Sequence, residues 1–319
     1  MSEREPAAVV WDLLRGAITT KALGIVADLR VAEALAAGPQ PVGELARATG
    51  VDSGVLHRLL RALASDGVFM EEAPGVFANT PASDLLSHPG WSSFAHLFGG
   101  LFYRALGDLD RATTTGKSTF ADAFDRDFWS WLGEHSEERA TFDLAMAGEK
   151  SSSVDRIGEL DWRDGEIVVD VGGGNGALLV ELLRRRPGLR GIVFDLPETD
   201  RDDTTFQDGL AFVEGSFFER IPEGDTYVLS GILHDWGDEP AAEILRTICD
   251  SAREGARLLI LDAVIPPGNG PAGSKWLDVL MLVLAGGRER TESDWWTLLD
   301  SVGLEVGQIE DGLIVARCP

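Results

Sequence analysis

The chain has 319 residues, of which 44% are hydrophobic, so it is long enough for two domains that each bury a substantial core. Its formal net charge of −25 argues against nucleic acid or an anionic membrane as a partner, because both attract a cationic surface. The two cysteines, Cys249 and Cys318, form no CxxC pair and no cluster, which argues against a disulfide scaffold or a zinc–thiolate site and fits a reducing compartment.

The N-terminal sequence "MSEREPAAVVWDLL" lacks the basic start and apolar core of a signal peptide. The most apolar stretch, "WLDVLMLVLAGG", contains an aspartate and is too short to span a bilayer. We therefore expect a soluble protein of the cytoplasm.

The N-terminal part is expected to be helical. Residues 7–35 show the pattern of helices interrupted near Gly24, and residues 42–49 predict a further helix. Another helix follows directly, and Asp52 or Ser53 could cap its N-terminus. The apolar face expected on this last helix consists of Val55, Leu59, Leu60 and Leu63.

The segment "GVFMEEAPGVFAN" comes next and predicts a β-hairpin that turns at its Pro-Gly pair. Helix, turn, helix and hairpin are typical of a winged helix, which often binds DNA. The candidate recognition helix offers only His57, Arg58 and Arg61, and residues 1–150 carry 13 Lys and Arg against 21 Asp and Glu. Because a DNA-reading domain is normally basic, we expect scaffolding here, with a DNA-binding regulator as the alternative.

Residues 91–155 predict further helices that are rich in aromatic side chains. Most of these side chains are expected in the core, and some could line an apolar pocket for a flat ring. Near residues 150–165 the pattern changes to short apolar strands that alternate with amphipathic helices. We therefore expect a mainly α winged-helix domain over residues 1–155 and a second domain over residues 156–319.

The second domain is expected to be an α/β, doubly wound, Rossmann-like parallel sheet that ends in an antiparallel C-terminal hairpin. The last segment, "GLEVGQIEDGLIVARCP", predicts that hairpin, with its turn at Asp311 and Gly312. The predicted strands cover residues 166–171, 191–194, 211–213, 226–230 and 257–261. The predicted helices cover residues 177–186, 240–253, 275–284 and 293–302.

The first of these strands leads into "VVDVGGGNGALLVELL", which places four glycines within five positions at a strand-to-helix turn. Such a turn lets a ligand approach the backbone and the helix N-terminus. The stretch also fits the dinucleotide fingerprint loosely, and Asp195 at the end of the next strand could hold a ribose hydroxyl. Ser216 follows the third strand, where an adenine could lie. Because NAD and S-adenosylmethionine both carry an adenosine, a nicotinamide oxidoreductase stays open.

A histidine and two acids follow the later strands. His234, the only histidine in residues 151–319, follows the fourth strand, and Asp262 ends the fifth, at the edge where open α/β sheets bind ligands. Glu289 lies in the polar loop "GGRERTESDWW". An imidazole flanked by carboxylates suits a general base, because the acids fix its tautomer and favour its cationic form. The alternative is that both acids are ordinary loop charges.

Several stretches together carry a more specific resemblance. They are "VVDVGGGNGALLVELLRRRPGLRGIVFDLPE", "LHDWGDE", "LLILDAVIP" and "LDVLMLVLAGGRERTESDWWTLLDSVGL". With the preceding winged helix, they resemble the S-adenosylmethionine-dependent O-methyltransferases of plant phenolic and bacterial natural-product pathways. The resemblance runs in order over nearly the whole chain.

The resemblance implies a set of cofactor contacts near the glycine turn. The family usually has an aspartate at the position of Ser216 and often a lysine at the position of Ser230, so this chain departs from it at both. The implied contacts are Gly172 and Gly174 at the methionine moiety, Asp195 at the ribose, and Ser216, Phe217 and Ser230 near the adenine.

The resemblance also implies catalytic residues. His234 of "HDW" corresponds to the base, with Asp262 and Glu289 as the flanking acids, although many members have a glutamate in place of Asp262. Met146 of "FDLAM" corresponds to a position that packs on the substrate ring, and Asp235 adjoins the base on the substrate side.

The implied reaction is in-line transfer of a methyl group from S-adenosylmethionine to a hydroxyl of an aromatic small molecule, which leaves S-adenosylhomocysteine. No metal is required, although Asp195, Asp235 and Asp262 could alternatively hold magnesium, as in catechol-type methyltransferases. The N-terminal domain is implied to form a homodimer that helps close the partner's pocket, against a monomer with a substrate lid. Some members of the fold bind the methyl donor yet hydroxylate, decarboxylate or cyclise their substrates, and this stays a further alternative.

Overall fold

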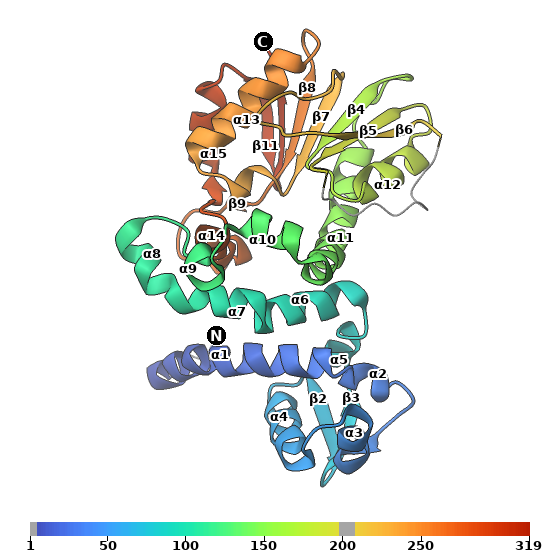
Figure 1. The fold of residues 1–319 in the computed structure, drawn as a ribbon, viewed down its shortest axis with the longest axis vertical. Coiled ribbons are helices and arrows are strands. Elements are labelled where there is room, and N and C mark those ends of the chain that lie inside the picture. The colour runs from blue at the N-terminus through green and yellow to red at the C-terminus, as the bar shows by residue number, and fades with distance from the viewer. Residues whose placement is uncertain (1–4, 198–207) are drawn as a thin grey trace. The chain divides into compact units, whose positions relative to one another are not determined.

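The computed structural model of the chain (Figure 1) describes residues 5–197 and 208–319. Contacts divide the chain into two compact units, one that ends at Arg104 and one that begins at Ala105. The change of sequence pattern near residue 155 falls inside the second unit, because the helix that spans it packs against the sheet domain. A functional division into residues 1–155 and 156–319 stays a prediction. No helix of the described residues is long and apolar enough to cross a membrane.

The first unit consists of helices and one small sheet. Its strands lie in the order β1-β3-β2, with antiparallel pairing throughout. The elements are α1 (Pro6–Asp28), α2 (Val31–Ala34), β1 (Gln40–Pro41), α3 (Val42–Thr49), α4 (Ser53–Ser65), β2 (Phe69–Ala73), β3 (Val76–Asn79), α5 (Pro81–Leu85), α6 (Pro89–Gly99) and α7 (Leu101–Ala105).

The predicted winged helix is present as α3, α4 and the hairpin β2–β3. Asp52 caps α4 by accepting a hydrogen bond from the Val55 N–H at 2.8 Å, as expected. The predicted apolar face is wrong by one position, because Val55 is 53% exposed and Leu56 takes its place in the core. Leu56, Leu60 and Leu63 follow the helical spacing of four and three residues, which puts them on one face.

The predicted break near Gly24 is wrong, since α1 runs without interruption from Pro6 to Asp28. Gly24 instead marks the point where α1 meets α6. A Cβ atom at Gly24 would lie 2.8 Å from the Cα atom of Gly99 and 2.9 Å from the carbonyl oxygen of Ala95. The glycine therefore permits a close backbone approach, which a sequence pattern cannot distinguish from a helix stop.

The second unit contains a seven-stranded sheet with the order β11-β12-β8-β7-β4-β5-β6. The five strands β4 to β8 are parallel, and the hairpin β11–β12 joins the edge at β8 in antiparallel register, as predicted. The chain runs outward from β4 to β6 and then returns to β7 on the other side of β4. This reversal between β4 and β7 is the topological switch point at which such sheets bind ligands. The strands are β4 (Ile167–Val171), β5 (Arg190–Asp195), β6 (Leu210–Glu214), β7 (Thr226–Ser230), β8 (Arg257–Leu261), β11 (Glu305–Glu310) and β12 (Leu313–Arg317).

Helices cover both faces of this sheet (Figure 1). Successive residues of the central strands alternate between the faces, so Val169 packs with α13 and α15 while Val168 packs with α11 and α12. Burial on both sides explains why these strands are continuous runs of Val, Ile and Leu. The helices of the unit are η1 (Leu106–Asp108), α8 (Leu109–Thr115), α9 (Phe120–Phe124), α10 (Phe128–Glu134), α11 (Ser136–Gly158), α12 (Ala177–Arg185), η3 (Leu233–Asp235), α13 (Asp238–Ser251), α14 (Gly273–Leu284) and α15 (Glu292–Asp300).

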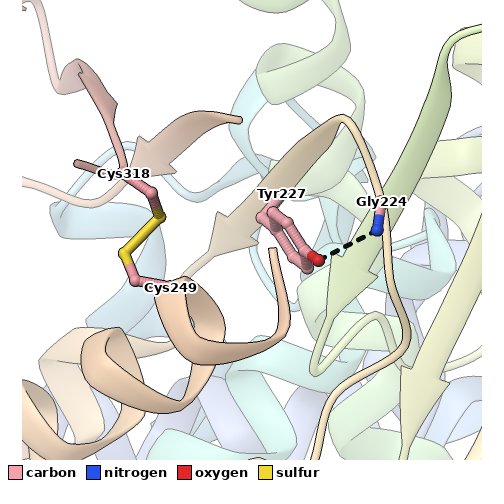
Figure 2. The surroundings of a disulfide bond; sticks show 4 residues. All are labelled: Gly224, Tyr227, Cys249 and Cys318. Carbon is pink, nitrogen blue, oxygen red and sulfur yellow. Dashed lines mark hydrogen bonds between the residues drawn. A yellow bond between two sulfur atoms is a disulfide. The ribbon is translucent and has the colours of Figure 1, made fainter. Parts of the chain in front are cut away.

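The two cysteines, whose spacing argued against a disulfide scaffold, form one disulfide. Cys249 in the last turn of α13 and Cys318 just after β12 form a disulfide, with their Cα atoms 5.4 Å apart (Figure 2). The pair is 69 residues apart in sequence, and only the packing of α13 against the sheet face beside β12 brings it together. Cysteine usage therefore gives no support for a reducing compartment. Nearby, the hydroxyl of Tyr227 in β7 accepts a hydrogen bond from the Gly224 N–H at 2.9 Å.

Candidate active site

The five parallel strands of the large sheet all end at one edge, and the predicted site residues follow these ends. The register of the strands brings the predicted cofactor contacts and the predicted base to the same edge of the second unit. In order from β4 to β8, the residues at the strand ends are Gly172, Asp195, Ser216, Ser230 with His234 beyond it, and Asp262.

The glycine turn after β4 is a bare stretch of backbone that leads into α12. Gly172, Gly174 and Gly176 have φ angles of 70°, 60° and 82°, a conformation that favours glycine. A Cβ atom at Gly172 would collide with the side chain of Ile232. The turn is held to the neighbouring strand, because the Gly174 N–H donates to Oδ2 of Asp195 at 2.7 Å. Exposed backbone next to a helix N-terminus fits a ligand that approaches closely there.

The loop after β6 lies next to Asp195. The Gly215 N–H donates to the Asp195 carbonyl at 3.0 Å, so Ser216 follows a residue that is held to the end of β5. The hydroxyl of Ser216 accepts a hydrogen bond from the Phe218 N–H at 3.3 Å. Phe217 meets Trp236 edge-on, with ring centroids 5.8 Å apart, and packs against the core beside α13. Phe217 therefore packs within the protein, and its contact with an adenine stays a prediction.

Ser230 at the end of β7 contacts a residue that the sequence does not single out. Its hydroxyl lies 3.1 Å from the hydroxyl of Ser153, which is buried on α11. No motif predicts this contact, because a serine within a long helix carries no spacing signal. Met146 lies half-buried on the same helix.

The imidazole of His234 is oriented by Glu289. Their atoms Nδ1 and Oε1 lie 2.7 Å apart, and the ionised carboxylate can only accept, so Nδ1 donates. Glu289 has no exposed side-chain surface, whereas His234 keeps 17% of its side chain exposed. This arrangement leaves Nε2 as the nitrogen that can accept a proton from a ligand.

The other two acids lie near the imidazole without a hydrogen bond to it. Oδ1 of Asp235 is 3.6 Å from Nε2, beyond hydrogen-bond range. Asp262 is buried, and neither of its carboxylate oxygens has a hydrogen-bond partner among the described residues. Of the two acids predicted to flank His234, the structure thus brings Glu289 into hydrogen-bonding contact, while Asp262 acts on His234 only through its charge.

The pKa values of His234, Asp235 and Asp262 are shifted by burial and by neighbouring charges. Burial by itself lowers the pKa of His234, but the neighbouring carboxylates outweigh it and raise that pKa to about 10. Burial raises the pKa of Asp235 to about 7 and that of Asp262 to about 6, against a partial lowering by the charge of His234. Perturbed groups gathered at a sheet edge are typical of a catalytic site.

The metal-binding alternative has no geometric counterpart in residues 5–197 and 208–319. Within these ranges, no group of three or more His, Cys, Asp or Glu side chains is placed so that it could hold a metal ion.

Comparisons with known families match both parts of the chain. The model of the O-methyltransferase domain matches residues 103–305, and the model of the O-methyltransferase dimerisation domain matches residues 11–88. Together these matches cover most of the chain in a single order.

Three individual proteins illustrate the similarity. The phenazine O-methyltransferase PhzM of Lysobacter antibioticus is 35% identical over 313 residues, which cover 95% of this chain and 92% of that protein. The 3-amino-4-hydroxybenzoate 4-O-methyltransferase of Streptomyces cremeus is 34% identical over 310 residues, which cover 93% of this chain and 85% of that protein. The O-methyltransferase NcsB1 from neocarzinostatin biosynthesis, solved with S-adenosylmethionine and 2-hydroxy-5-methyl naphthoic acid, superposes with a TM-score of 0.82 at 31% identity, covering 94% of this chain and 95% of that one.

Proposed function

The chain belongs to the S-adenosylmethionine-dependent O-methyltransferases, and from that membership we propose that it methylates a hydroxyl of an aromatic small molecule with His234 as general base. Its relatives include enzymes that methylate a phenazine and an aminohydroxybenzoate. A hydroxylated aromatic ring, made in a bacterial natural-product pathway, is therefore the acceptor class that we assign to this chain.

One observation carries the assignment of the base. The hydrogen bond from Nδ1 of His234 to Glu289 fixes the tautomer in which Nε2 is free to accept a proton. The same sheet edge carries the glycine turn, so a base and a cofactor site would lie across one switch point.

The residues around the glycine turn suit the cofactor. Gly172 and Gly174 would take the methionine moiety, Asp195 the ribose hydroxyls, and the loop at Ser216 and Phe217 the adenine. S-adenosylmethionine, when bound, supplies an electrophilic methyl carbon on a positively charged sulfur. What the protein adds is the alignment of the acceptor oxygen and the removal of its proton. Alignment alone is worth on the order of 7–11 kcal/mol in well-oriented reactions.

Proton removal matters because a phenol with a pKa of about 10 is mostly protonated at neutral pH. The raised pKa of His234 means that the protein without ligands holds an imidazolium there at neutral pH. A cation near this edge lowers that pKa, so we expect the neutral base to become populated when the cofactor is bound. Neutral His234 would then accept the acceptor's proton at Nε2, while Met146 and Asp235 contact the acceptor. A general base of this kind contributes roughly 10²–10⁴-fold to the rate.

The proposal is tested by incubating the protein with S-adenosylmethionine and a panel of acceptors: a hydroxyphenazine, 3-amino-4-hydroxybenzoate and 1,4-dihydroxy-2-naphthoate. Mass spectrometry should detect a product that has gained one methyl group in place of a hydrogen, together with S-adenosylhomocysteine. Products that have gained an oxygen or lost carbon dioxide would instead support the non-methylating chemistry of the alternative. Full activity in excess chelator is expected, and loss of activity would support the magnesium alternative.

We also propose a homodimer formed through the N-terminal unit, which contains the match to the dimerisation domain. The N-terminal half of α1 exposes large apolar side chains that water would not favour in a monomer. Sedimentation at micromolar concentration should give twice the mass of the chain. Cell fractionation tests the accompanying proposal that the enzyme works in the cytoplasm. The exposed side chains of α1 are Val10, Trp11, Leu13, Leu14 and Ile18, at 56%, 65%, 69%, 68% and 71%.

A further inference from the structure

Arg290 is a fully buried arginine directly after Glu289 in the short strand β10 (Arg290–Thr291). All three nitrogens of its guanidinium are engaged. Nη1 donates to the Leu233 carbonyl at 2.9 Å, Nη2 to the Trp236 carbonyl at 2.9 Å, and Nε to Oδ1 of Asp238 at 3.0 Å. The planar fork of the guanidinium thus holds two main-chain carbonyls and one carboxylate.

The two carbonyls lie on either side of His234. Leu233 begins the three-residue 3-10 helix η3, and Trp236 is the residue at its C-terminal cap. The Leu233 carbonyl accepts the Trp236 N–H of the turn at 3.3 Å, and the Trp236 carbonyl lies past the C-terminal end, where carbonyls have no partner within a helix. A turn of three residues holds its own shape poorly. Arg290 donates to both carbonyls from outside the turn, and the ring of Trp295 packs against the guanidinium with its centroid 5.2 Å from Cζ.

The residues before Arg290 contact the same turn through their backbone. The Arg288 N–H donates to the His234 carbonyl at 2.8 Å. Gly287 lies so close to the backbone of His234 and Asp235 that no Cβ atom fits there. Residues 287–290 therefore contact the turn at three kinds of group. Glu289 bonds the imidazole, Arg288 bonds the His234 carbonyl, and Arg290 bonds the two flanking carbonyls.

A purely stabilising role does not account for a charge in this place. Burying a guanidinium is costly, and burial lowers the pKa of Arg290. Apolar side chains of similar volume often stabilise a core as well or better. What an apolar side chain cannot do is to fix two carbonyls at a defined distance from a catalytic imidazole.

We propose that Arg290 is a positioning residue for His234, which it keeps in contact with Glu289 by fixing the carbonyls of Leu233 and Trp236. This inference rests on the proposed function, in which His234 is the base. Arg290 touches neither substrate nor cofactor in this account, so its effect is confined to the steps that need the base.

The experiment compares Arg290→Lys with Arg186→Lys. Lysine keeps the positive charge but cannot form the three-pointed contact. Arg186 is the matched control, because its guanidinium also donates to a main-chain carbonyl at a helix end, that of Gly158, at 2.9 and 2.6 Å. We expect Arg290→Lys to lower kcat by about 10–100-fold, the scale of effect known for misplaced catalytic groups. Binding of S-adenosylmethionine should be unchanged in both variants, and kcat should be unchanged in Arg186→Lys.

Acceptors of different acidity separate positioning from general damage. A phenol that is already ionised needs no base, so the loss in Arg290→Lys should shrink as the acceptor's pKa falls. Equal losses for all acceptors would mean that Arg290 supports the fold and not the base, and kcat equal to that of the parent would overturn the proposal too. If His234→Gln is fully active, the base assignment itself fails. If His234→Gln is impaired and Arg290→Lys is not, only the role of Arg290 fails.

A second readout needs no acceptor. The chain has five histidines, so the ring of His234 can be identified by nuclear magnetic resonance with labelled histidine. We expect the deshielded proton of the His234–Glu289 hydrogen bond to broaden or disappear in Arg290→Lys and to persist in Arg186→Lys. If Arg290→Lys does not fold, Asp238→Asn replaces it, because Asp238 is 53% exposed and its Oδ1 atom lies 3.0 Å from both Nε and Nη2 of Arg290. A weakened proton signal in Asp238→Asn supports the proposal, and a signal identical to that of the parent overturns it.

Discussion

Nδ1 of His234 and Oε1 of Glu289 lie 2.7 Å apart, although 54 residues separate them in the sequence. The carboxylate is buried and the imidazole keeps 17% of its side chain exposed, so the ring is the member of the pair that a ligand can reach. The account of catalysis depends on this orientation, because it determines which nitrogen can act as the base.

Replacing Glu289 with glutamine removes the negative charge beside His234 and keeps a side chain of the same size. An amide can donate to Nδ1 and so stabilise the tautomer in which Nε2 already carries a proton. We expect Glu289→Gln to lower kcat by on the order of 10²–10⁴-fold while S-adenosylmethionine still binds, as in related histidine–carboxylate pairs. Glu292→Gln is the matched control, since Glu292 is exposed in the first turn of the next helix. Equal kcat in the two variants would refute the role of Glu289.

Asp262 should make stability depend on pH. Its pKa is raised to about 6 in the folded protein from an ordinary value of 3.8, so the folded state binds the proton more tightly than the unfolded chain does. The resulting loss of folding stability is absent below pH 3.8 and increases until the pH passes 6. A shift of two pKa units corresponds to about 2.7 kcal/mol, an upper limit because an amide brings its own unpaired donors.

We therefore expect Asp262→Asn to be more stable than the parent at pH 8 and equally stable at pH 4. Urea unfolding at the two pH values measures the difference. A variant that loses stability at pH 8 would show that the carboxylate has a favourable partner in solution. Methyl transfer should fall in the same variant if Asp262 supports the cationic form of His234.

The two glycines of α1 should respond in opposite directions to alanine. A Cβ atom at Gly24 meets the backbone of α6, so Gly24→Ala should destabilise the N-terminal unit by about 1–3 kcal/mol, as other overpacked sites do. A Cβ atom at Gly16 has open space around it, and Gly16→Ala should stabilise the helix by about 0.5–1 kcal/mol. Denaturant unfolding of both variants checks the pair. Destabilisation by Gly16→Ala, or none by Gly24→Ala, would contradict the described crossing.

The fold of the sheet domain could be predicted well, because its strands are short continuous apolar runs and the helices between them have a clear apolar period. The strands β7 and β8 have the predicted bounds, and the remaining ones differ by one or two residues. What the sequence could not give is contact between distant segments. The disulfide from Cys249 to Cys318, the Ser153–Ser230 contact and the position of Gly24 all depend on packing that no local pattern records.

In the candidate site, too, local patterns could be predicted and contacts between distant residues could not. Strand ends predict which residues share an edge, and the described structure has Asp195, His234 and Asp262 at that edge. The pattern does not predict which acid bonds the imidazole, because Asp262 and Glu289 are both compatible with the spacing. Arg290 could not be recognised either, since a buried arginine in "GRERT" looks the same in sequence as its half-buried neighbour Arg288.

The disulfide should contribute measurably to stability. Closing a loop of 69 residues lowers the entropy of the unfolded chain, which corresponds to about 4 kcal/mol on the usual loop-length relation. We expect a reductant to lower the free energy of unfolding of the parent by about this amount. The Cys249→Ser, Cys318→Ser double variant should be insensitive to the reductant. An identical response of the parent and the double variant would mean that the bond does not form in solution.

The most direct test of the account is the turnover number of His234→Gln at saturating S-adenosylmethionine and saturating acceptor. His88→Gln is the control, because His88 is exposed and its side chain makes no capping hydrogen bond. We predict a loss of roughly 10²–10⁴-fold in His234→Gln with unchanged cofactor binding, and no loss in His88→Gln. Turnover of His234→Gln within a few-fold of the parent would contradict the account.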